Sequence, residues 1–357
     1  CNVKLVWIWG YQRIAYNGHG NLMLAKAVRF LSRSAIVALL LGIVSFAGGY
    51  VWHNKIMNVD GPHRDDVLIV VEPGSGHNTL RHALNRAGVL HQIYHYDAAR
   101  LLAGNRFLPK AGEFLLPARI NLNKVLAIIN KGHSHQRRVT IVEGLRSADV
   151  VKQINLMPNL TGAIDAMPEE GSLRPETYFY THGTPRQALI NWMQETQEIA
   201  LAEAWAQRGR NLPYDKPQDA LIIASIIEKE TSSDKERHLV AAVLINRLRK
   251  GMRLQSDPTV VYDSSESPAQ PLPITKTDLK TKTPWNTYVI SGLPRTPICN
   301  PGQESIIAAL HPAKSDYLYF VSDGKGGLRF AKTLDEHNRN VRSFRQYEAA
   351  SKKGSGK

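Results

Sequence analysis

The sequence predicts an α+β protein with a single N-terminal transmembrane helix, a small β-α-α-β-α module and a larger mixed α/β domain. Three observations predict this arrangement. An uncharged apolar run lies near the N-terminus, short β-branched segments then alternate with amphipathic ones, and a strongly apolar helix begins near residue 219. With 357 residues, 43% of them hydrophobic, the chain can bury two or three compact cores.

The apolar run extends from Ser34 to Trp52 without a charged residue, close to the length of about 20 residues that crosses a bilayer. Three basic residues precede it: Lys26, Arg29 and Arg33. Because positive charge stays on the cytoplasmic side, we expect a cytoplasmic N-terminus and an exported remainder. A cleaved signal peptide is the alternative, but no Ala-x-Ala site precedes Asn54, which favours an uncleaved anchor.

Composition and turn signals divide the chain further. The predicted parts are a cytoplasmic segment (1–33), the transmembrane helix (34–52), a polar linker (53–66), a first module (67–132), a second module with a connecting helix (138–215), the larger domain (216–347) and a disordered tail (348–357). Residues 1–22 have an unusual composition, and Met23 begins a typical membrane-protein start, so 1–22 can be an artefact.

The first module has clear local signals. VLIVVEP predicts a strand, TLRHALNRAGV a helix, KAGEFLLP a second strand, and NLNKVLAIINKG a helix that ends at Gly132; another helix is expected around 96–104. RRVTIVEGLRSADVVKQI repeats the plan of strand, glycine turn and helix. A long amphipathic helix then runs from Arg186 to about Gln207.

Charge and cysteine content exclude several classes of function. The net charge of +14 predicts anionic surroundings, but no nucleic-acid-binding motif is present, so no nucleic-acid partner is expected. Cys1 and Cys299 stand far apart in the sequence, and the histidine pairs have no third ligand at a useful spacing. We therefore expect no metal.

The segment DALIIASIIEKET carries two glutamates on an apolar helix. A rotation of 100° per residue places Glu228 beside the small residues Ala224 and Ser225, and places Glu230 on the opposite side among isoleucines. Small neighbours would leave space for a ligand, and an apolar surrounding would keep Glu228 protonated as a general acid. The alternative is that Glu228 caps or pairs with a neighbouring helix.

A second helix is predicted to follow at once. Ser233 and Glu236 have the spacing of a capping box, and Gly251 ends the helix. Asn246 and Arg247 stand near its end, where they could hold a ligand amide or the Glu228 carboxylate, or pair with the loop QSDPT.

These segments resemble a known family. The matching blocks are EGSLRPETYFY, ASIIEKET, VLINRL, GMRLQSDPTVVY, WNTY, SGLP, PICNPG, AALHPA and DYLYFVSDGKGG. In this order and spacing they are similar to the endolytic murein transglycosylases of the YceG-like (MltG) family. The resemblance implies a lyase of the bacterial inner membrane with its catalytic domain in the periplasm. Such an enzyme cleaves the bond between N-acetylmuramic acid and N-acetylglucosamine within peptidoglycan strands, forms 1,6-anhydro ends and terminates nascent strands during cell-wall synthesis.

The resemblance also implies site residues and partners. It assigns the acid to Glu228 and implies a glycan cleft with these further residues: Asn246, Arg247, Gln255, Asp257, Asn286, Thr287 and Tyr288. It implies a LysM-like first module, no cofactor, and contact with peptidoglycan synthases (penicillin-binding proteins). Trp285 and Arg295 depart from the usual family pattern. A muramidase-type hydrolase with water held by Asp257 and a non-catalytic wall-binding scaffold are the alternative functions.

Overall fold

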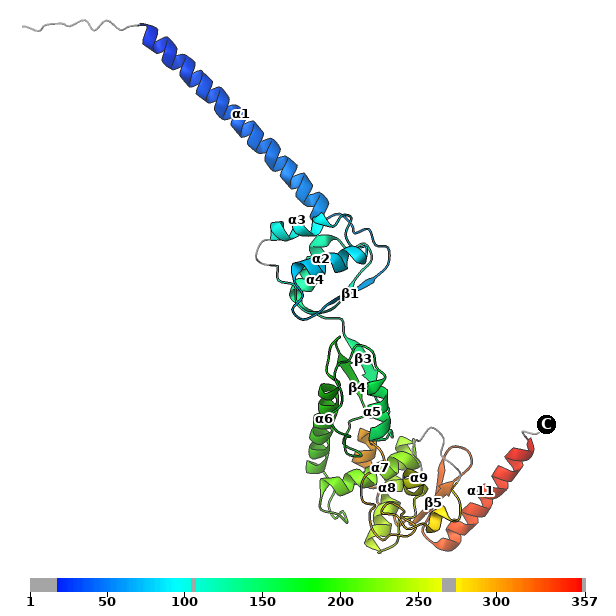
Figure 1. Cartoon of the computed structure of the whole chain (residues 1–357). Coiled ribbons are helices and arrows are strands. Elements are labelled where there is room, and N and C mark those ends of the chain that lie inside the picture. The colour runs from blue at the N-terminus through cyan, green and yellow to red at the C-terminus, as the bar shows by residue number, and fades with distance from the viewer. Residues whose placement is uncertain (1–17, 104–106, 265–273, 355–357) are drawn as a thin grey trace, which may run out of the picture. The chain divides into compact units, whose positions relative to one another are not determined.

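The computed structural model describes residues 18–103, 107–264 and 274–354. The chain divides into two compact units, residues 1–133 and 134–357 (Figure 1). Helices and short antiparallel strand pairs make up both units, so the fold mixes α and β elements as the sequence predicted.

The first unit begins with a long helix, α1 (Gly18–Met57). Its stretch Arg29–Met57 has a mean hydropathy of 2.1 in its most apolar part, which is not buried, and among the described helices it alone is long and apolar enough to cross a membrane. The predicted span Ser34 to Trp52 lies inside this stretch. At its far end Ile56 and Met57 are buried in the core of the module that follows.

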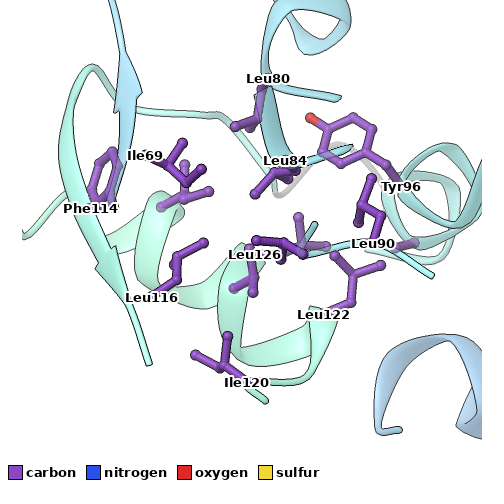
Figure 2. Close-up of a cluster of buried hydrophobic side chains, with 14 of the residues drawn as sticks. Ile69, Leu80, Leu84, Leu90, Tyr96, Phe114, Leu116, Ile120, Leu122 and Leu126 are labelled. Carbon is purple, nitrogen blue, oxygen red and sulfur yellow. The ribbon is translucent and has the colours of Figure 1, made fainter. Parts of the chain in front are cut away.

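That module has the predicted element order. Its elements are β1 (Val67–Val71), α2 (His77–Arg86), α3 (Tyr94–Ala103), β2 (Gly112–Leu116) and α4 (Leu122–Lys131). β1 and β2 pair antiparallel, with Ile69 opposite Phe114. Both side chains point into a core that α2, α3 and α4 complete with Leu80, Tyr96 and Leu126 (Figure 2). The module therefore has a hydrophobic core of its own.

The ends of α4 show how the sequence fixes an element. The Asn121 side chain accepts a hydrogen bond from the backbone N–H of Lys124 at 3.0 Å, which caps the first turn. Gly132 follows the last residue with φ of 75°, a left-handed conformation that glycine adopts without steric cost. The predicted end at Gly132 is confirmed.

The second unit contains two neighbouring cores. The first is built by β3 (Arg137–Thr140), α5 (Ser147–Asn155), β4 (Thr177–Tyr180) and α6 (Arg186–Ala206). β3 and β4 pair antiparallel, and the strand, glycine turn and helix predicted for this segment are present as β3, Gly144 and α5.

The second core is mainly helical. Its elements, with the strands and helices beside it, are α7 (Pro217–Glu230), α8 (Asp234–Arg249), α9 (Asp257–Ser264), the short η2 (Asp278–Lys280), α10 (Gln303–Leu310), β5 (Tyr319–Ser322), β6 (Leu328–Ala331) and α11 (Leu334–Gly354). α7 is its central element, since α8, α9, α10 and α6 all contact it (Figure 1).

Two local predictions differ from the structure. Ser233 is the N-cap of α8, but its side chain makes no capping hydrogen bond among the described residues. The Glu236 carboxylate instead accepts hydrogen bonds from the Thr231 hydroxyl and the Leu328 backbone N–H, so tertiary contacts replace the predicted capping box. The tail predicted to be disordered from residue 348 is helical to Gly354, because its alanine, glutamate and lysine residues favour continuation of α11.

Candidate functional site

The two glutamates at the end of α7 have different surroundings. Residues 220–227 of this helix are all buried, so the helix is covered on every side for two turns. Only in its last turn do Glu228 and Glu230 extend beyond the core. As the sequence predicted from the helical rotation, the two side chains do not share one cleft.

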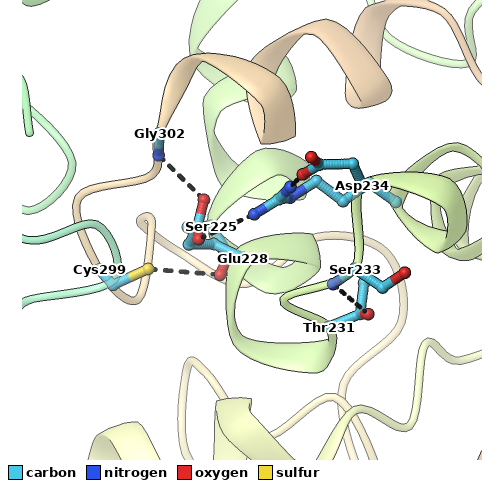
Figure 3. Close-up of polar contacts among 8 residues, drawn as sticks. Ser225, Glu228, Thr231, Ser233, Asp234, Cys299 and Gly302 are labelled. Carbon is cyan, nitrogen blue, oxygen red and sulfur yellow. Dashed lines mark hydrogen bonds and ion pairs between the residues drawn. The ribbon is translucent and has the colours of Figure 1, made fainter. Parts of the chain in front are cut away.

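Glu228 is held by direct polar contacts. Its Oε2 accepts a hydrogen bond from the Gly302 backbone N–H at 2.9 Å, and its Oε1 lies 3.8 Å from Nη2 of Arg237 (Figure 3). Only 7% of the Glu228 side chain is exposed. Gly302 is the N-cap of α10, so the positive end of that helix also faces the carboxylate. Both oxygens of the Glu228 carboxylate therefore face groups of the chain itself.

The space expected beside Glu228 is filled. Ser225 and Ala224 are fully buried, and residues 298 and 299 contact Ser225. The Ile298 N–H donates to the Ser225 hydroxyl at 3.0 Å. Cys299 Sγ also contacts the Ser225 carbonyl, at 3.4 Å (Figure 3). The prediction that these small residues leave room for a ligand is therefore wrong: they allow a close approach of the chain itself.

Glu230 lies at a cavity of about 510 Å³. The polar and aromatic residues that line this reaction cavity include Glu230, Arg247, Gln255, Ser256, Asp257, Tyr288, Tyr319 and His337. Its size falls within the range of ligand pockets, about 300–1,000 Å³. The lining residues come from α7, α8, α9 and α11, from β5, and from the segments that precede α9 and follow η2.

Burial raises the pKa of Glu230 to about 7. The Ser256 hydroxyl donates a hydrogen bond to its Oε1 at 2.6 Å and opposes the rise, the negative charge of Asp257 adds to it, and the Arg247 guanidinium opposes it. A glutamic acid with this pKa is about half protonated at neutral pH and can therefore act as a proton donor or, once ionised, as a base. Glu230 thus has the profile of a general acid.

One further carboxylate, of Asp257, and one phenol, of Tyr288, lie in the same cavity. The Tyr288 hydroxyl donates a short hydrogen bond to the exposed carboxylate of Asp257. Burial, together with this bond, raises the pKa of Tyr288, so the phenol stays protonated. Asp257 begins α9, and the backbone of Gln255 just before it has φ of 52°, a strained conformation for a residue with a side chain.

Arg247 stabilises one wall of the cavity through several contacts. Its guanidinium donates to the carbonyls of Leu318 and Leu254 at 2.6 and 2.8 Å and to Gln255 Oε1 at 3.2 Å. It also lies 5.1 Å from the centre of the Tyr319 ring. These contacts tie α8 to β5 and to the loop before α9, which places Gln255 and Asp257 beside Glu230.

Of the seven residues expected around the glycan cleft, four line the cavity: Arg247, Gln255, Asp257 and Tyr288. The other three support it from behind. Asn246 and Asn286 donate to backbone carbonyls of the segments 315–317 and 278–281. Thr287 is fully buried and accepts a hydrogen bond from the Ser256 backbone N–H at 2.9 Å.

Glu230, Ser256, Tyr319 and His337 line the cavity but were not predicted as site residues from the sequence. Tyr319 on β5 and His337 on α11 stack with ring centres 5.2 Å apart. Burial lowers the pKa of His337, and the Arg247 charge lowers it further, so the imidazole is neutral. A tyrosine in an alternating strand and a lone histidine in a polar helix carry no local signal of a site.

A carboxyl group whose pKa is raised to about 7, in a polar and aromatic cavity, defines a site for general acid chemistry. Within the described ranges, no cluster of three or more His, Cys, Asp or Glu residues is arranged to hold a metal ion. The chain belongs to the YceG-like family, whose profile matches residues 69–343.

Two similar proteins have the same name, endolytic murein transglycosylase. An endolytic murein transglycosylase of Bacillus subtilis (strain 168) is 39% identical over 174 residues, which cover 48% of this chain and 47% of that protein. An endolytic murein transglycosylase of Streptococcus pneumoniae serotype 2 is 32% identical over 179 residues, covering 48% of this chain and 31% of that protein. The chain therefore spans less than half the length of these relatives.

A solved structure is also similar. A YceG-like protein of Listeria monocytogenes is 27% identical, and the alignment covers 77% of this chain and 98% of that chain with a TM-score of 0.48.

Proposed function

We propose that this protein is an endolytic murein transglycosylase that cleaves the bond between N-acetylmuramic acid and N-acetylglucosamine within peptidoglycan strands. Membership of the YceG-like family and the name of its relatives support this activity. The observation that carries the proposal in this chain is Glu230, a glutamic acid with a pKa of about 7 at a cavity of ligand size.

We further propose Glu230 as the proton donor. The sequence placed this role on Glu228, and that assignment stays a competing prediction. Glu228 faces an arginine and a helix N-terminus, and the chain fills the space beside it. Glu230 instead faces the reaction cavity, together with four of the residues expected around the glycan. Geometry therefore favours Glu230.

The reaction needs one carboxyl group used twice. Glu230 gives its proton to the glycosidic oxygen, the bond from that oxygen to C1 of the muramic acid breaks, and positive charge develops on the sugar ring. The Glu230 carboxylate then takes the proton of the muramic acid C6 hydroxyl, whose oxygen bonds to C1 and closes the 1,6-anhydro ring. No water is consumed, and the intramolecular hydroxyl has a high effective concentration.

The residues around Glu230 have supporting roles in this proposal. The Asp257 carboxylate keeps the Tyr288 hydroxyl oriented, and its negative charge stabilises the positive charge of the sugar ring. The Ser256 hydroxyl fixes one oxygen of Glu230 and leaves the other free to face substrate. Arg247 positions Gln255 and Asp257 through the cavity wall.

A muramidase-type hydrolase is the closest alternative, because Asp257 is an exposed second carboxylate in the same cavity. Glycosidases with two carboxylates use the second as a base or nucleophile and add water to the product. Mass spectrometry of muropeptides released from purified sacculi separates the two: 1,6-anhydro ends support the transglycosylase, and reducing ends support the hydrolase. Release of neither would favour the wall-binding scaffold.

The apolar helix α1 supports a topology proposal. We expect α1 to anchor the protein in the inner membrane with its N-terminus in the cytoplasm, because Lys26, Arg29 and Arg33 precede the apolar stretch. Alkaline phosphatase fused after Lys357 should therefore be active, and a fluorescent protein that folds only in the cytoplasm should be dark there. The reverse pattern would contradict this orientation.

The first module is proposed to bind the cell wall as a LysM-like domain. Its β-α-α-β-α order and independent core support a folded module. Deleting residues 67–132 should lower the rate of cleavage of intact sacculi or change the length of the products, while cleavage of short soluble glycans should persist. If the rate and the product length on sacculi were unchanged, the module would be only a spacer.

Termination of nascent strands and contact with peptidoglycan synthases are proposed from the same resemblance. An anchored enzyme would meet strands close to the membrane, where synthases extend them.

A further inference from the structure

The second unit contains another, larger cavity of about 850 Å³. It lies between α6, α7 and α9, beside the loop before β4 and the segment 295–297. Glu230 and the other residues named for the reaction cavity do not line it. Trp285 and Arg295, the two departures from the family pattern, do. We call it the distal cavity.

Two short segments contribute lining residues to both cavities. α9 contributes Asp257 to the reaction cavity and Tyr262 to the distal cavity, five residues and therefore about 7.5 Å along the helix. The segment after η2 contributes Tyr288 to the reaction cavity and Trp285 to the distal cavity, at most about 11 Å of extended chain. A linear polymer with one unit at Glu230 could therefore reach both cavities.

The deeper surface of the distal cavity is largely apolar. Leu201, Leu221 and Ile222 line it and are each only 7% exposed. The rings of Tyr262 and Trp285 meet edge to face at 5.5 Å, and the Trp285 indole N–H donates to the Thr296 hydroxyl at 2.9 Å. The Tyr262 hydroxyl is tied to Glu170 at 3.2 Å. Both rings are thus held in fixed orientations and remain partly exposed.

The outer surface is polar. Gln218, Glu169, Glu198 and Arg295 line the cavity and are exposed, and Gln194 lies between them and the apolar floor. Amides both donate and accept hydrogen bonds, and carboxylates accept them. A sugar ring has matching surfaces, with apolar C–H faces and a polar edge of hydroxyl and N-acetyl groups.

We propose that the distal cavity binds N-acetylated sugars of the same glycan strand, remote from the bond that is cleaved. The inference rests on the proposed function and deepens it: a site that holds the strand away from its cleaved bond favours cutting within long strands. Three carboxylates, of Glu169, Glu170 and Glu198, line the distal cavity with one arginine, Arg295. The alternative is therefore that the cavity binds an amino group of a stem peptide. The experiment below separates the two ligands.

The test uses the full chain with Glu198→Ala and Gln218→Ala combined. The substrates are peptide-free glycans of alternating N-acetylglucosamine and N-acetylmuramic acid, a tetrasaccharide and an octasaccharide. Loss of two modest hydrogen bonds should raise the KM for the octasaccharide about tenfold. The kcat should stay within about twofold, and the tetrasaccharide constants should not change, because neither residue touches the reaction cavity. Glu195→Ala, an exposed residue of α6 that lines neither cavity, is the matched control.

An unchanged octasaccharide KM, or equal losses on both substrates, would overturn the proposal. So would a defect confined to peptide-bearing strands, which would assign the cavity to the stem peptide. Calorimetric titration of the octasaccharide into Glu230→Gln protein, with and without the two substitutions, tests binding without turnover. A different result would contradict the proposed function alone. In that case the parent protein would release no 1,6-anhydro products, while the titration would still show that the two substitutions weaken octasaccharide binding.

Discussion

Replacing Glu230 with Gln is expected to abolish the release of 1,6-anhydro products from purified sacculi. Gln keeps the size of the side chain and can still accept the hydrogen bond from Ser256, but it has no proton to transfer. General acid catalysis contributes about 10²- to 10⁴-fold. Because the same group would also act as the base for ring closure, the loss should reach the upper end of this range. The rate of product release, followed by mass spectrometry, measures it.

Glu228→Gln is the matched control, since it makes the same chemical change two residues away. The Gln carbonyl oxygen can still accept the hydrogen bond from the Gly302 N–H, so the local packing should survive. The variant should retain measurable turnover, with a loss much smaller than that of Glu230→Gln. The opposite result, an inactive Glu228→Gln and an active Glu230→Gln in folded proteins, would restore the assignment made from the sequence.

The two glutamates show what the sequence can establish and what it cannot. The rotation of the helix correctly separates Glu228 from Glu230, because that depends only on local geometry. Which side is open depends on segments far along the chain. Residues 298–302 close the side of Glu228, and Ser256 and Asp257 approach Glu230. The sequence suggests space next to small residues, but small residues also permit close packing.

The elements themselves were more predictable than the site. Strand β1, helix α4 and its end at Gly132 follow from β-branched runs, periodicity and a glycine cap, all of which are local signals. The capping box at Ser233 failed because Glu236 has stronger partners in β6 and in the turn after α7. Tyr319 and His337 reach the cavity only through the packing of β5 and α11, which no single segment encodes.

The raised pKa of Glu230 also predicts how stability changes with pH. The pKa of this group rises on folding from an ordinary value of 4.5 to about 7. Between these values the folded state therefore binds more protons than the unfolded state. Stability from the protonated form is complete below about pH 4.5, falls as the pH rises from about 4.5 to 7, and is fully lost above pH 7. A rise of about 2.5 in the pKa corresponds to about 3.5 kcal/mol, since each pKa unit is about 1.4 kcal/mol.

Glu230→Gln removes this titration because the amide stays neutral. Relative to the parent, the variant should therefore gain free energy of unfolding as the pH rises from about 4.5 to 7, and the gain should stay constant at up to about 3.5 kcal/mol above pH 7. Urea unfolding of both full-length proteins in detergent at several pH values measures the difference, in which the other titrating groups cancel. Glu228→Gln should show no such gain, because it leaves the Glu230 carboxyl group in place. Parallel stability curves for the parent and Glu230→Gln would show that Glu230 ionises normally, and would remove the physical basis for its role as the acid.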